Sequence, residues 1–381
     1  MEKIFGFTQE EIKEKSMTYT INEINRQPEV WKSIYEKIIF DREKIKNFMK
    51  SFDSDTRILF MGAGSSAFIG DSLAPLIRKE FSFSDVESIH TTDAVASPWQ
   101  YFVRNVKTVL ISFGRSGDSP ESIAAIEIAE KHINNLYHII ITCNPSGKLA
   151  GYKNDRTLNL VFDEINDQGF AMTSSVTGMM LAAYSLFAIE VDLKQEINII
   201  TNYAKEIIKS KYQIISDVFE KNVNRLIVLG SANLFGVARE SALKSIELTR
   251  GRVMSWYDTP MGFRHGPKSL LTDNTVILYF VSNNEYTRKY DMDMLSELSQ
   301  SMKHRLLVVS DKYSSEVNDY ADVYIYNSKE NVLSEAFTPY SALLVAQIFA
   351  LSASLKIGCT PDNPFPNGEV NRVVKGVSIH R

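Results

Sequence analysis

One feature of this sequence constrains its fold more than any other: three apolar runs in the first half return in the same order in the second half. The runs pair as RILFMG with RLIVLG, TVLISF with TVILYF, and HIIITCN with RLLVVSD. Each run is short, almost wholly apolar and rich in β-branched residues, which is typical of parallel strands covered on both faces. The repeated order predicts two similar domains.

Helical patterns separate these strands. The segments 120–132 and 288–303 have helical spacing of apolar residues, so each repeat is expected to contain βαβ units. Long apolar helices are expected over 174–189 and 340–355, one closing each repeat. The sequence therefore predicts an α/β protein of two similar doubly wound parallel-sheet, flavodoxin-like domains in tandem, with sites at the carboxyl ends of the strands.

The chain is expected to divide into four segments. The first is helical, with Trp31, Ile34, Ile38 and Ile39 at the spacing of one apolar helix face. The last is rich in Pro, Asn and Gly and is expected to be a loop that completes the active site. The four expected segments are 1–50, 51–205, 206–357 and 358–381.

Charge and composition exclude several classes of protein. The 42 Lys and Arg residues face 46 Asp and Glu residues, so the net charge is −4 and neither a nucleic acid nor an anionic membrane is expected as a partner. The cysteines, Cys143 and Cys359, have neither the number nor the spacing for a zinc site, so no metal is expected. Few cysteines, a charged N-terminus and the lack of a long uninterrupted apolar stretch together predict a cytoplasmic protein.

The clearest candidate binding site follows the TVLISF run, where the sequence reads GRSGDSPES. Glycines such as Gly117 let the backbone approach an anion, and the hydroxyls of Ser116 and Ser119 can donate hydrogen bonds to it. Pro120 suits the first position of a helix whose N-cap is Ser119. The N-terminus of that helix would then face the oxygens of a phosphate group.

The same loop has a simpler explanation, in which the glycines only turn the chain and Ser119 only caps the helix. Asp118 and Glu121 favour that explanation, because their carboxylates can accept from the same N–H groups and repel an anion. In the second repeat the corresponding loop, SNNEYTR, has no glycine. We therefore expect one phosphate to bind per chain.

A second glycine loop, GAGSSAFIG, follows the first strand. Its spacing differs from the GxGxxG fingerprint, so no dinucleotide is expected there. No other organic cofactor is expected either, because the chemistry considered below needs none. We expect Ser65 and Ser66 of this loop to reach into the same pocket as Ser116.

Several residues of the second half could carry out chemistry, although each has a simpler interpretation. In ARESALKSIELTRG, Glu240 and Lys244 have the spacing of a surface ion pair, and Glu247 could be one more solvated carboxylate. His265 stands in a loop between glycine and proline, where it could titrate near a substrate or only make a surface hydrogen bond. Lys375, in VVKGVSIH, is by itself most simply a solvated lysine.

Taken together, these motifs resemble the sugar isomerase (SIS) domain proteins and, more closely, the AgaS-type family among them. The resemblance spans nearly the whole chain and rests on GAGSSAFIGD, TTDAVASP, SFGRSGDSPES, DQGFAMTSSVT, ARESALKSIELT, PMGFRHGPKSL, GCTPDNP and NRVVKGVSIH. Members of that family are tagatose-6-phosphate ketose/aldose isomerases or galactosamine-6-phosphate deaminase/isomerases. The resemblance implies two SIS domains and a hexose 6-phosphate as the substrate.

A more distant resemblance, to the isomerase half of glucosamine-6-phosphate synthase, implies roles for individual residues. It implies that Glu247 shuttles a proton, that His265 opens the sugar ring, and that Lys375 stabilises charge on a substrate oxygen. The residues implied to hold phosphate and sugar are Ser66, Ser116, Gly117, Ser119, Phe170 and Ala171.

Two departures from the synthase affect these expectations. The synthase loop has serine where this chain has Gly114 and threonine where it has Ser119, so one hydroxyl contact is either lost or replaced by Arg115. Nothing in this sequence corresponds to the glutaminase domain of the synthase. We therefore expect this chain to release ammonia rather than to install it.

The resemblance implies a reaction in which Glu247 moves a proton from C2 of an opened amino-hexose 6-phosphate to C1. Hydrolysis of the resulting ketimine gives D-tagatose 6-phosphate and ammonia from D-galactosamine 6-phosphate, and Glu247 should be partly buried for this role. The alternative is a plain ketose/aldose isomerase that acts on tagatose or galactose 6-phosphate. A sugar-phosphate sensor is a third possibility. SIS proteins generally pair, so a homodimer or higher oligomer is expected, with His265 acting in cis or in trans.

Overall fold

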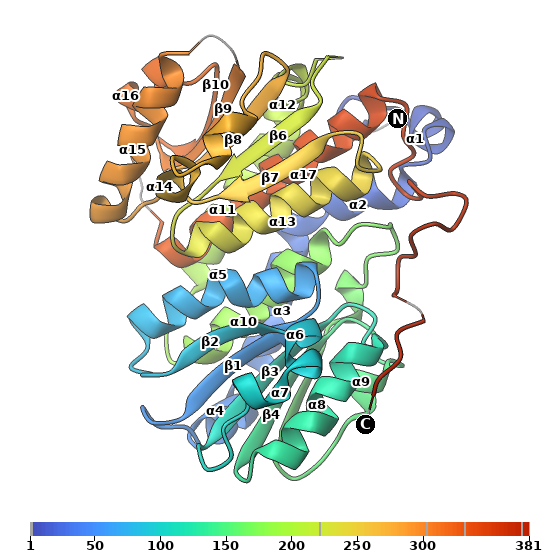
Figure 1. Cartoon of the computed structure of the whole chain (residues 1–381), viewed down its shortest axis with the longest axis vertical. Helices are drawn as coiled ribbons and strands as arrows, with labels where there is room; N and C mark the ends of the chain where they lie inside the picture. The colour runs from blue at the N-terminus through green and yellow to red at the C-terminus, as the bar shows by residue number, and fades with distance from the viewer. Residues whose placement is uncertain (1–2, 221, 302–303, 331–332, 375, 381) are drawn as a thin grey trace. The chain divides into compact units, whose positions relative to one another are not determined.

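The chain forms two five-stranded parallel sheets, which confirms the fold class predicted from the repeated apolar runs (Figure 1). The structure is a computed structural model that describes residues 3–220, 222–301, 304–330, 333–374 and 376–380. The described chain divides into two compact units. The first-sheet unit contains 29–167, 174–197 and 370–380, and the second-sheet unit contains 3–28, 168–173 and 198–369.

This division differs from the four segments expected from the sequence. The N-terminal helices and the C-terminal tail do not stand as segments of their own, because each is shared between the two units. The apolar helix face expected in the first segment is buried at Trp31, Ile34 and Ile38. The side chain of Ile39 is 39% exposed, so Ile39 does not belong to the buried face.

The first-sheet unit has the strand order β2-β1-β3-β4-β5, with every neighbouring pair parallel. Its strands are β1 (Arg57–Gly62), β2 (Val86–His90), β3 (Thr108–Gly114), β4 (Leu136–Thr142) and β5 (Thr157–Val161). Its helices are α4 (Arg42–Met49), α5 (Ser65–Glu80), α6 (Thr91–Ala96), α7 (Pro98–Tyr101), α8 (Pro120–His132), α9 (Lys148–Gly151), η1 (Asp163–Ile165) and α10 (Ser174–Phe187).

The second-sheet unit repeats this topology with the order β7-β6-β8-β9-β10, again all parallel. Its strands are β6 (Arg225–Leu229), β7 (Met254–Asp258), β8 (Thr275–Phe280), β9 (His304–Lys312) and β10 (Val323–Ser328). Its helices are α1 (Gln9–Glu14), α2 (Thr18–Asn25), η2 (Ile207–Lys211), α12 (Tyr212–Asp217), α13 (Asn233–Leu248), α14 (Pro260–Phe263), η3 (Pro267–Leu270), α15 (Glu285–Ser299), α16 (Ser315–Tyr320), η4 (Glu335–Phe337) and α17 (Thr338–Lys356). Two helices, α3 (Gln27–Phe40) and α11 (Lys194–Glu206), contain residues of both units.

Helices cover both faces of each sheet, which is why the central strands are apolar throughout. Every residue of β1, β3 and β8 is buried. On one face of the second sheet α15 supplies Met294, Leu295 and Leu298 to the core. On the other face α13 and α17 run side by side (Figure 1). This layering exposes the carboxyl ends of the strands as the edge at which a site can form.

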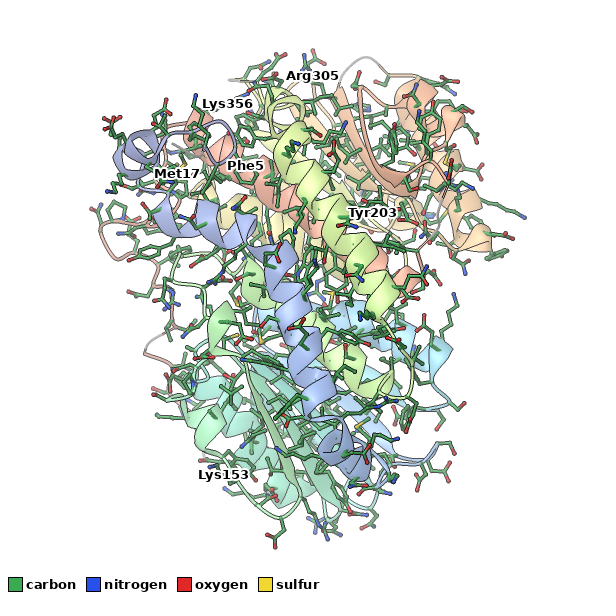
Figure 2. The ribbon with its side chains drawn as sticks, turned by 180° about the vertical axis from the view of Figure 1, so that it is seen from behind. Phe5, Met17, Lys153, Tyr203, Arg305 and Lys356 are labelled. Carbon is green, nitrogen blue, oxygen red and sulfur yellow. The ribbon has the colours of Figure 1, made fainter. Side chains whose placement is uncertain are left out.

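One helix among the described residues, 335–356, has the length and hydropathy of a membrane span, and every residue in its most apolar window is buried. Its position explains that composition. It packs against α13, and at its end Lys356 Nζ donates to the carbonyl oxygens of Ser216 and Phe219, at 2.6 and 3.0 Å (Figure 2).

Candidate active site

Three charged side chains of α13 form a buried cluster in the second-sheet unit. Lys244 has no solvent exposure, and its Nζ lies 2.5 Å from Glu247 Oε2 and 3.2 Å from Glu240 Oε1. The side chain of Glu240 is only 2% exposed, whereas that of Glu247 is 24% exposed. The interpretation of Glu240 and Lys244 as a surface pair is therefore wrong, because α13 packs against α17, β6 and β7.

The cluster carries one cation and two carboxylates. Burial alone would lower the pKa of the Lys244 ammonium, but the carboxylates of Glu240 and Glu247 outweigh burial and raise its pKa above the ordinary value. Lys244 is therefore charged at neutral pH and holds Oε2 of Glu247 in place. The other oxygen, Glu247 Oε1, has no hydrogen-bond partner among the described residues. The arrangement gives a fixed carboxylate with one oxygen available to a ligand.

The loop between η1 and α10 brings Phe170 and Ala171 to the end of α13. Ala171 belongs to a small buried apolar cluster with Leu248, the residue after Glu247. The ring of Phe170 lies 5.3 Å from that of Phe365, centroid to centroid. The second-sheet unit therefore brings the expected sugar segment and the expected proton-shuttling acid close together.

His265 lies in the turn between α14 and η3, and it is exposed. Its backbone N–H donates to Gly262 O at 2.9 Å, and Gly266 after it adopts a φ of +124°, which side-chain-bearing residues rarely adopt. The imidazole has no hydrogen-bond or ionic partner in the part of the chain that the structure describes. The turn thus fixes the backbone of His265 while leaving its ring free for a ligand or another chain.

The expected phosphate loop joins β3 to α8 in the first-sheet unit. Three carbonyl oxygens of this loop accept hydrogen bonds from the last residue of β4 or from the segment that follows β4. They belong to Gly114, Ser116 and Gly117. In that order the donors are Thr142 Oγ1 at 2.6 Å, Asn144 Nδ2 at 3.0 Å and Leu149 N at 3.0 Å. The loop is therefore anchored by its carbonyl groups.

The donor groups of the same loop remain available. The N–H groups of Ser116, Gly117 and Ser119 have no acceptor within the described residues. Gly117 adopts a φ of +69°, which explains why glycine stands there. Ser119 is the N-cap residue and Pro120 the first residue of α8, as predicted, but the Ser119 side chain makes no capping hydrogen bond. Free N–H groups at a helix N-terminus are the usual components of a phosphate site.

Asp118 does not occupy these donors. Its Oδ1 accepts from Lys148 N at 3.0 Å, at the start of α9, and its own N–H donates to Ser116 Oγ at 3.3 Å. The Asp118 carboxylate therefore accepts from the start of α9 and not from the N–H groups at the start of α8. The expectation that Asp118 would compete with an anion for those N–H groups is not met.

Ser65 and Ser66 are the first residues of α5, directly after β1, and both are buried. The turn before them is tight, because a Cβ on Gly62 would lie 2.4 Å from the carbonyl carbon of Ser66. Since β1 and β3 are neighbours in the sheet, this turn and the phosphate loop follow the carboxyl ends of adjacent strands.

The C-terminal tail contacts the phosphate loop within the first-sheet unit. Arg115 is 7% exposed, and its Nη2 donates to Arg372 O at 2.9 Å. The Arg372 guanidinium in turn donates to Asp167 O. Lys375, the third expected catalytic residue, lies outside the described residues.

In the second sheet, a carboxylate of the protein accepts a hydrogen bond from the loop that corresponds to the phosphate loop. Asp291, on α15, accepts from Ser231 Oγ at 2.5 Å and from Ser282 N at 2.9 Å. In the repeat, Ser282 corresponds to Arg115 of the phosphate loop. Burial, opposed by these hydrogen bonds, raises the pKa of Asp291 to about 6. In this loop the N–H of Ser282 is therefore bonded to a carboxylate of the protein, and the N–H of Asn284 donates to Ser282 Oγ at 3.1 Å. That the chain binds one phosphate stays a prediction.

The expected site residues thus fall into two groups. The second-sheet unit contains Phe170, Ala171, Glu247 and His265, and the first-sheet unit contains Ser65, Ser66, Arg115, Ser116, Gly117 and Ser119. The sequence did not predict the contacts of Arg372, although Arg372 lies three residues before Lys375 in the motif NRVVKGVSIH. No group of three potential metal ligands occurs among the described residues.

Comparison with known proteins agrees with this architecture. A family model described as the SIS domain matches residues 51–189. The D-galactosamine-6-phosphate deaminase AgaS of Escherichia coli is 40% identical over 373 residues, which cover 95% of this chain and 96% of that protein.

Two solved structures are similar over almost the whole chain. A protein of Clostridium novyi NT has a TM-score of 0.97 at 39% identity and covers 100% of both chains. The tagatose-6-phosphate ketose/aldose isomerase of Escherichia coli has a TM-score of 0.88 at 38% identity, covering 95% of this chain and 96% of that one. With this extent of identity and the same double-sheet architecture, the chain belongs to the AgaS family of SIS-domain proteins.

Proposed function

We propose that this protein is an amino-sugar-phosphate deaminase/isomerase that converts D-galactosamine 6-phosphate to D-tagatose 6-phosphate and ammonia. One observation carries the proposal: the Glu247 carboxylate is half-buried, is held through one oxygen by the buried Lys244, and has no partner among the described residues at its other oxygen. A proton shuttle needs this combination of a fixed position and an accessible oxygen. The AgaS relative named above is a D-galactosamine-6-phosphate deaminase, which supports the substrate class.

Substrate binding is assigned to the phosphate loop. The phosphate group accepts from the free N–H groups of Ser116, Gly117 and Ser119 and from the two serine hydroxyls, with Ser65 and Ser66 following the adjacent strand. Arg115 supplies a positive charge in the same loop. The phosphate group is on C6 of the sugar, several bonds away from C1 and C2. Its contacts with the loop provide binding free energy that positions C1 and C2 for the chemistry.

The chemistry is assigned to the second-sheet unit, where Phe170 and Ala171 lie beside the sugar. His265 transfers the proton that opens the ring. Glu247 then removes the C2 proton to form an enolamine and returns a proton to C1, which leaves a ketimine at C2. Water adds to that ketimine, the C–N bond breaks, and ammonia leaves as the C2 ketone forms. Lys375 is assigned to stabilise charge on the substrate oxygen.

A ketose/aldose isomerase is the second candidate, because the similar Escherichia coli structure bears that name. The same proton transfer at a substrate with a hydroxyl at C2 interconverts galactose and tagatose 6-phosphates without releasing ammonia. The two candidates are separated by measuring ammonia and ketose in parallel from galactosamine, glucosamine and galactose 6-phosphates.

The test of the mechanism replaces Glu247 by Gln, which keeps the size of the side chain but removes its basicity. Ammonia release should be lost, and product formed by the wild type in D₂O should carry deuterium at C1. The exposed Glu316 of α16 provides a control, since Glu316→Gln makes the same chemical change away from the cluster. Full activity in Glu247→Gln would refute the assignment.

His265 is proposed to act in a neighbouring chain of a cytoplasmic homodimer, because its exposed ring has no partner among the described residues of its own chain. Mixing Glu247→Gln with His265→Ala chains tests this. If the site is shared, random pairing should restore up to about a quarter of the wild-type activity, because half of the mixed dimers' sites carry both native residues. Two inactive variants that stay inactive when refolded together would place His265 in cis.

A further inference from the structure

The N-terminal helix α2 holds the segment that carries Phe170 and Ala171. The Glu23 carboxylate accepts from two successive backbone N–H groups at the start of that segment: from Gln168 N at 2.5 Å and from Gly169 N at 3.2 and 3.3 Å through its two oxygens. Glu23 is 4% exposed. A buried charge bonded to adjacent N–H groups fixes the backbone direction of both residues.

Glycine at position 169 makes this close approach possible. A Cβ at that position would lie 2.9 Å from Glu23 Oε2 and 3.1 Å from Thr20 Oγ1, which is closer than these atoms tolerate without moving. Gly169 does not have a positive φ, so the requirement for glycine there is one of space.

A second contact holds the other end of the segment. Gln347 Nε2 of α17 donates to the carbonyl oxygen of Thr173 at 3.4 Å, and Gln347 Oε1 accepts from Gln27 Nε2 at 2.7 Å. Both glutamines are fully buried. Residues near the N-terminus therefore hold the segment at both ends, directly through Glu23 and indirectly through Gln27.

The C-terminal tail fixes α2 itself. The Asp362 carboxylate accepts from Tyr19 N at 2.9 Å, from Thr20 N at 2.8 Å and from Thr20 Oγ1 at 2.9 Å, in the first turn of the helix. Asp362 N donates to Ser16 O at 3.0 Å. Met17, labelled in Figure 2, precedes the helix in this turn. An acidic side chain at a helix N-terminus is favourable both as a hydrogen-bond acceptor and against the helix dipole.

Between its two held ends, the segment packs against the end of α13. Ala171 contacts the apolar cluster that contains Leu248, so a shift of the segment would be transmitted to the residue next to Glu247. We infer that Glu23 is a positioning residue for the reaction: its carboxylate sets the position of Phe170 and Ala171 relative to Glu247. The inference rests on the proposed function, because it assigns those two residues to the sugar.

The test compares Glu23→Ala with Glu23→Gln at a temperature well below unfolding. Gln keeps an oxygen that can accept from both N–H groups, so it should rescue most of what Ala loses. We expect Glu23→Ala to lower kcat/KM by about 100-fold, the effect of a misplacement of about 1 Å. Glu10→Gln, at an exposed position of α1, controls for the loss of a carboxylate.

Gly169→Ala provides a second variant that leaves Glu23 in place. It should reproduce the kinetic loss, because the added methyl group pushes the segment away from the carboxylate. Hydrogen exchange should become faster at Gln168 and Gly169 in Glu23→Ala, while protection of the phosphate loop by inorganic phosphate stays as in the wild type. A general loss of folding would change both.

The outcomes separate this inference from the proposed function. An active wild type with an equally active Glu23→Ala would overturn the inference alone, as would unchanged exchange at Gln168 and Gly169. A wild type that releases no ammonia from galactosamine 6-phosphate would overturn the proposed function and the kinetic role of Glu23 with it.

Discussion

Lys244 donates a hydrogen bond of 2.5 Å to the Glu247 carboxylate from a position that has no solvent exposure. The same ammonium lies 3.2 Å from the buried Glu240. Two carboxylates therefore share one cation, and only Glu247 reaches solvent. The ion pair with Glu247 is partly open and the ion pair with Glu240 is closed. We therefore expect Glu240 and Lys244 to contribute to stability, Lys244 also to hold Glu247 in place, and Glu247 to be the carboxylate that a ligand can reach.

The first prediction concerns stability. Lys244→Met should lower the free energy of unfolding by about 3 kcal/mol or more, because it leaves a carboxylate buried without its counter-ion. Denaturant unfolding at neutral pH measures this loss, with the change in midpoint compared at constant slope.

A double variant separates stability from activity. Glu240→Gln combined with Lys244→Met removes both buried charges, so most of the lost stability should return, while ammonia release stays low because Glu247 is no longer held. If the single and double variants are equally unstable, the cost comes from packing rather than from an unpaired charge. If the double variant regains full activity, Lys244 does not position Glu247.

The central strands were predictable because they are apolar on both faces. The runs that became β1, β3, β4, β6, β8 and β9 were all identified from their sequence. The outer strands were not identified. In β7, for example, Met254 and Trp256 are exposed on a strand with only one neighbour, so its sequence has no continuous apolar run.

The candidate site gave a signal in the sequence only where a local motif carries it, and its function stays a prediction. Ser116, Gly117 and Ser119 follow a strand and begin a helix, so the spacing of residue types alone suggested an anion site. Glu23 gave no such signal, because its partners at Gln168 and Gly169 are distant in sequence. Lys244 was misjudged for a related reason: helical spacing to Glu240 cannot tell a buried ion pair from an exposed one.

The second prediction tests the phosphate loop. Ser116→Ala combined with Ser119→Ala should weaken binding of galactosamine 6-phosphate by about 100-fold, since each hydroxyl bond to a charged group contributes about 1.5 kcal/mol. Binding of unphosphorylated galactosamine should change little. Calorimetric titration of both sugars measures the difference, and Ser146→Ala, at an exposed position of the next loop, is the control. Equal weakening for both sugars would show that phosphate binds elsewhere.

The third prediction is a pH dependence of stability that belongs to Asp291. Its pKa is about 6 in the folded chain against an ordinary value of 3.8, so between these values the folded protein holds a proton that the unfolded chain has lost. Stability should therefore rise as pH falls from about 6 to 4, by up to roughly 3 kcal/mol from this group. Unfolding midpoints measured from pH 7 to 4 report this rise.

Asp291→Asn isolates that contribution, because other groups titrate over the same range. Asn keeps an acceptor for Ser282 N and cannot ionise, so the variant should be at least as stable as the wild type at pH 7. The stability difference between the two proteins should shrink on acidification. The same difference at every pH would mean that Asp291 does not titrate in this range.

The last prediction concerns Gly147, which lies outside the phosphate loop but determines where the loop sits. A Cβ on Gly147 would lie 2.3 Å from the carbonyl oxygen of Ser116, so Gly147→Ala must displace that carbonyl. Gly151, four residues later, has open space around its Cβ position, so Gly151→Ala is a matched control.

We expect Gly147→Ala to weaken binding of galactosamine 6-phosphate by about 10-fold, a cost of about 1.4 kcal/mol, without removing any group that contacts the phosphate. Gly151→Ala should bind normally and be slightly more stable, since alanine is favoured over glycine in a helix. Equal affinities for the two variants would show that the loop adjusts freely, and its position would then not depend on the carbonyl contacts from the segment after β4.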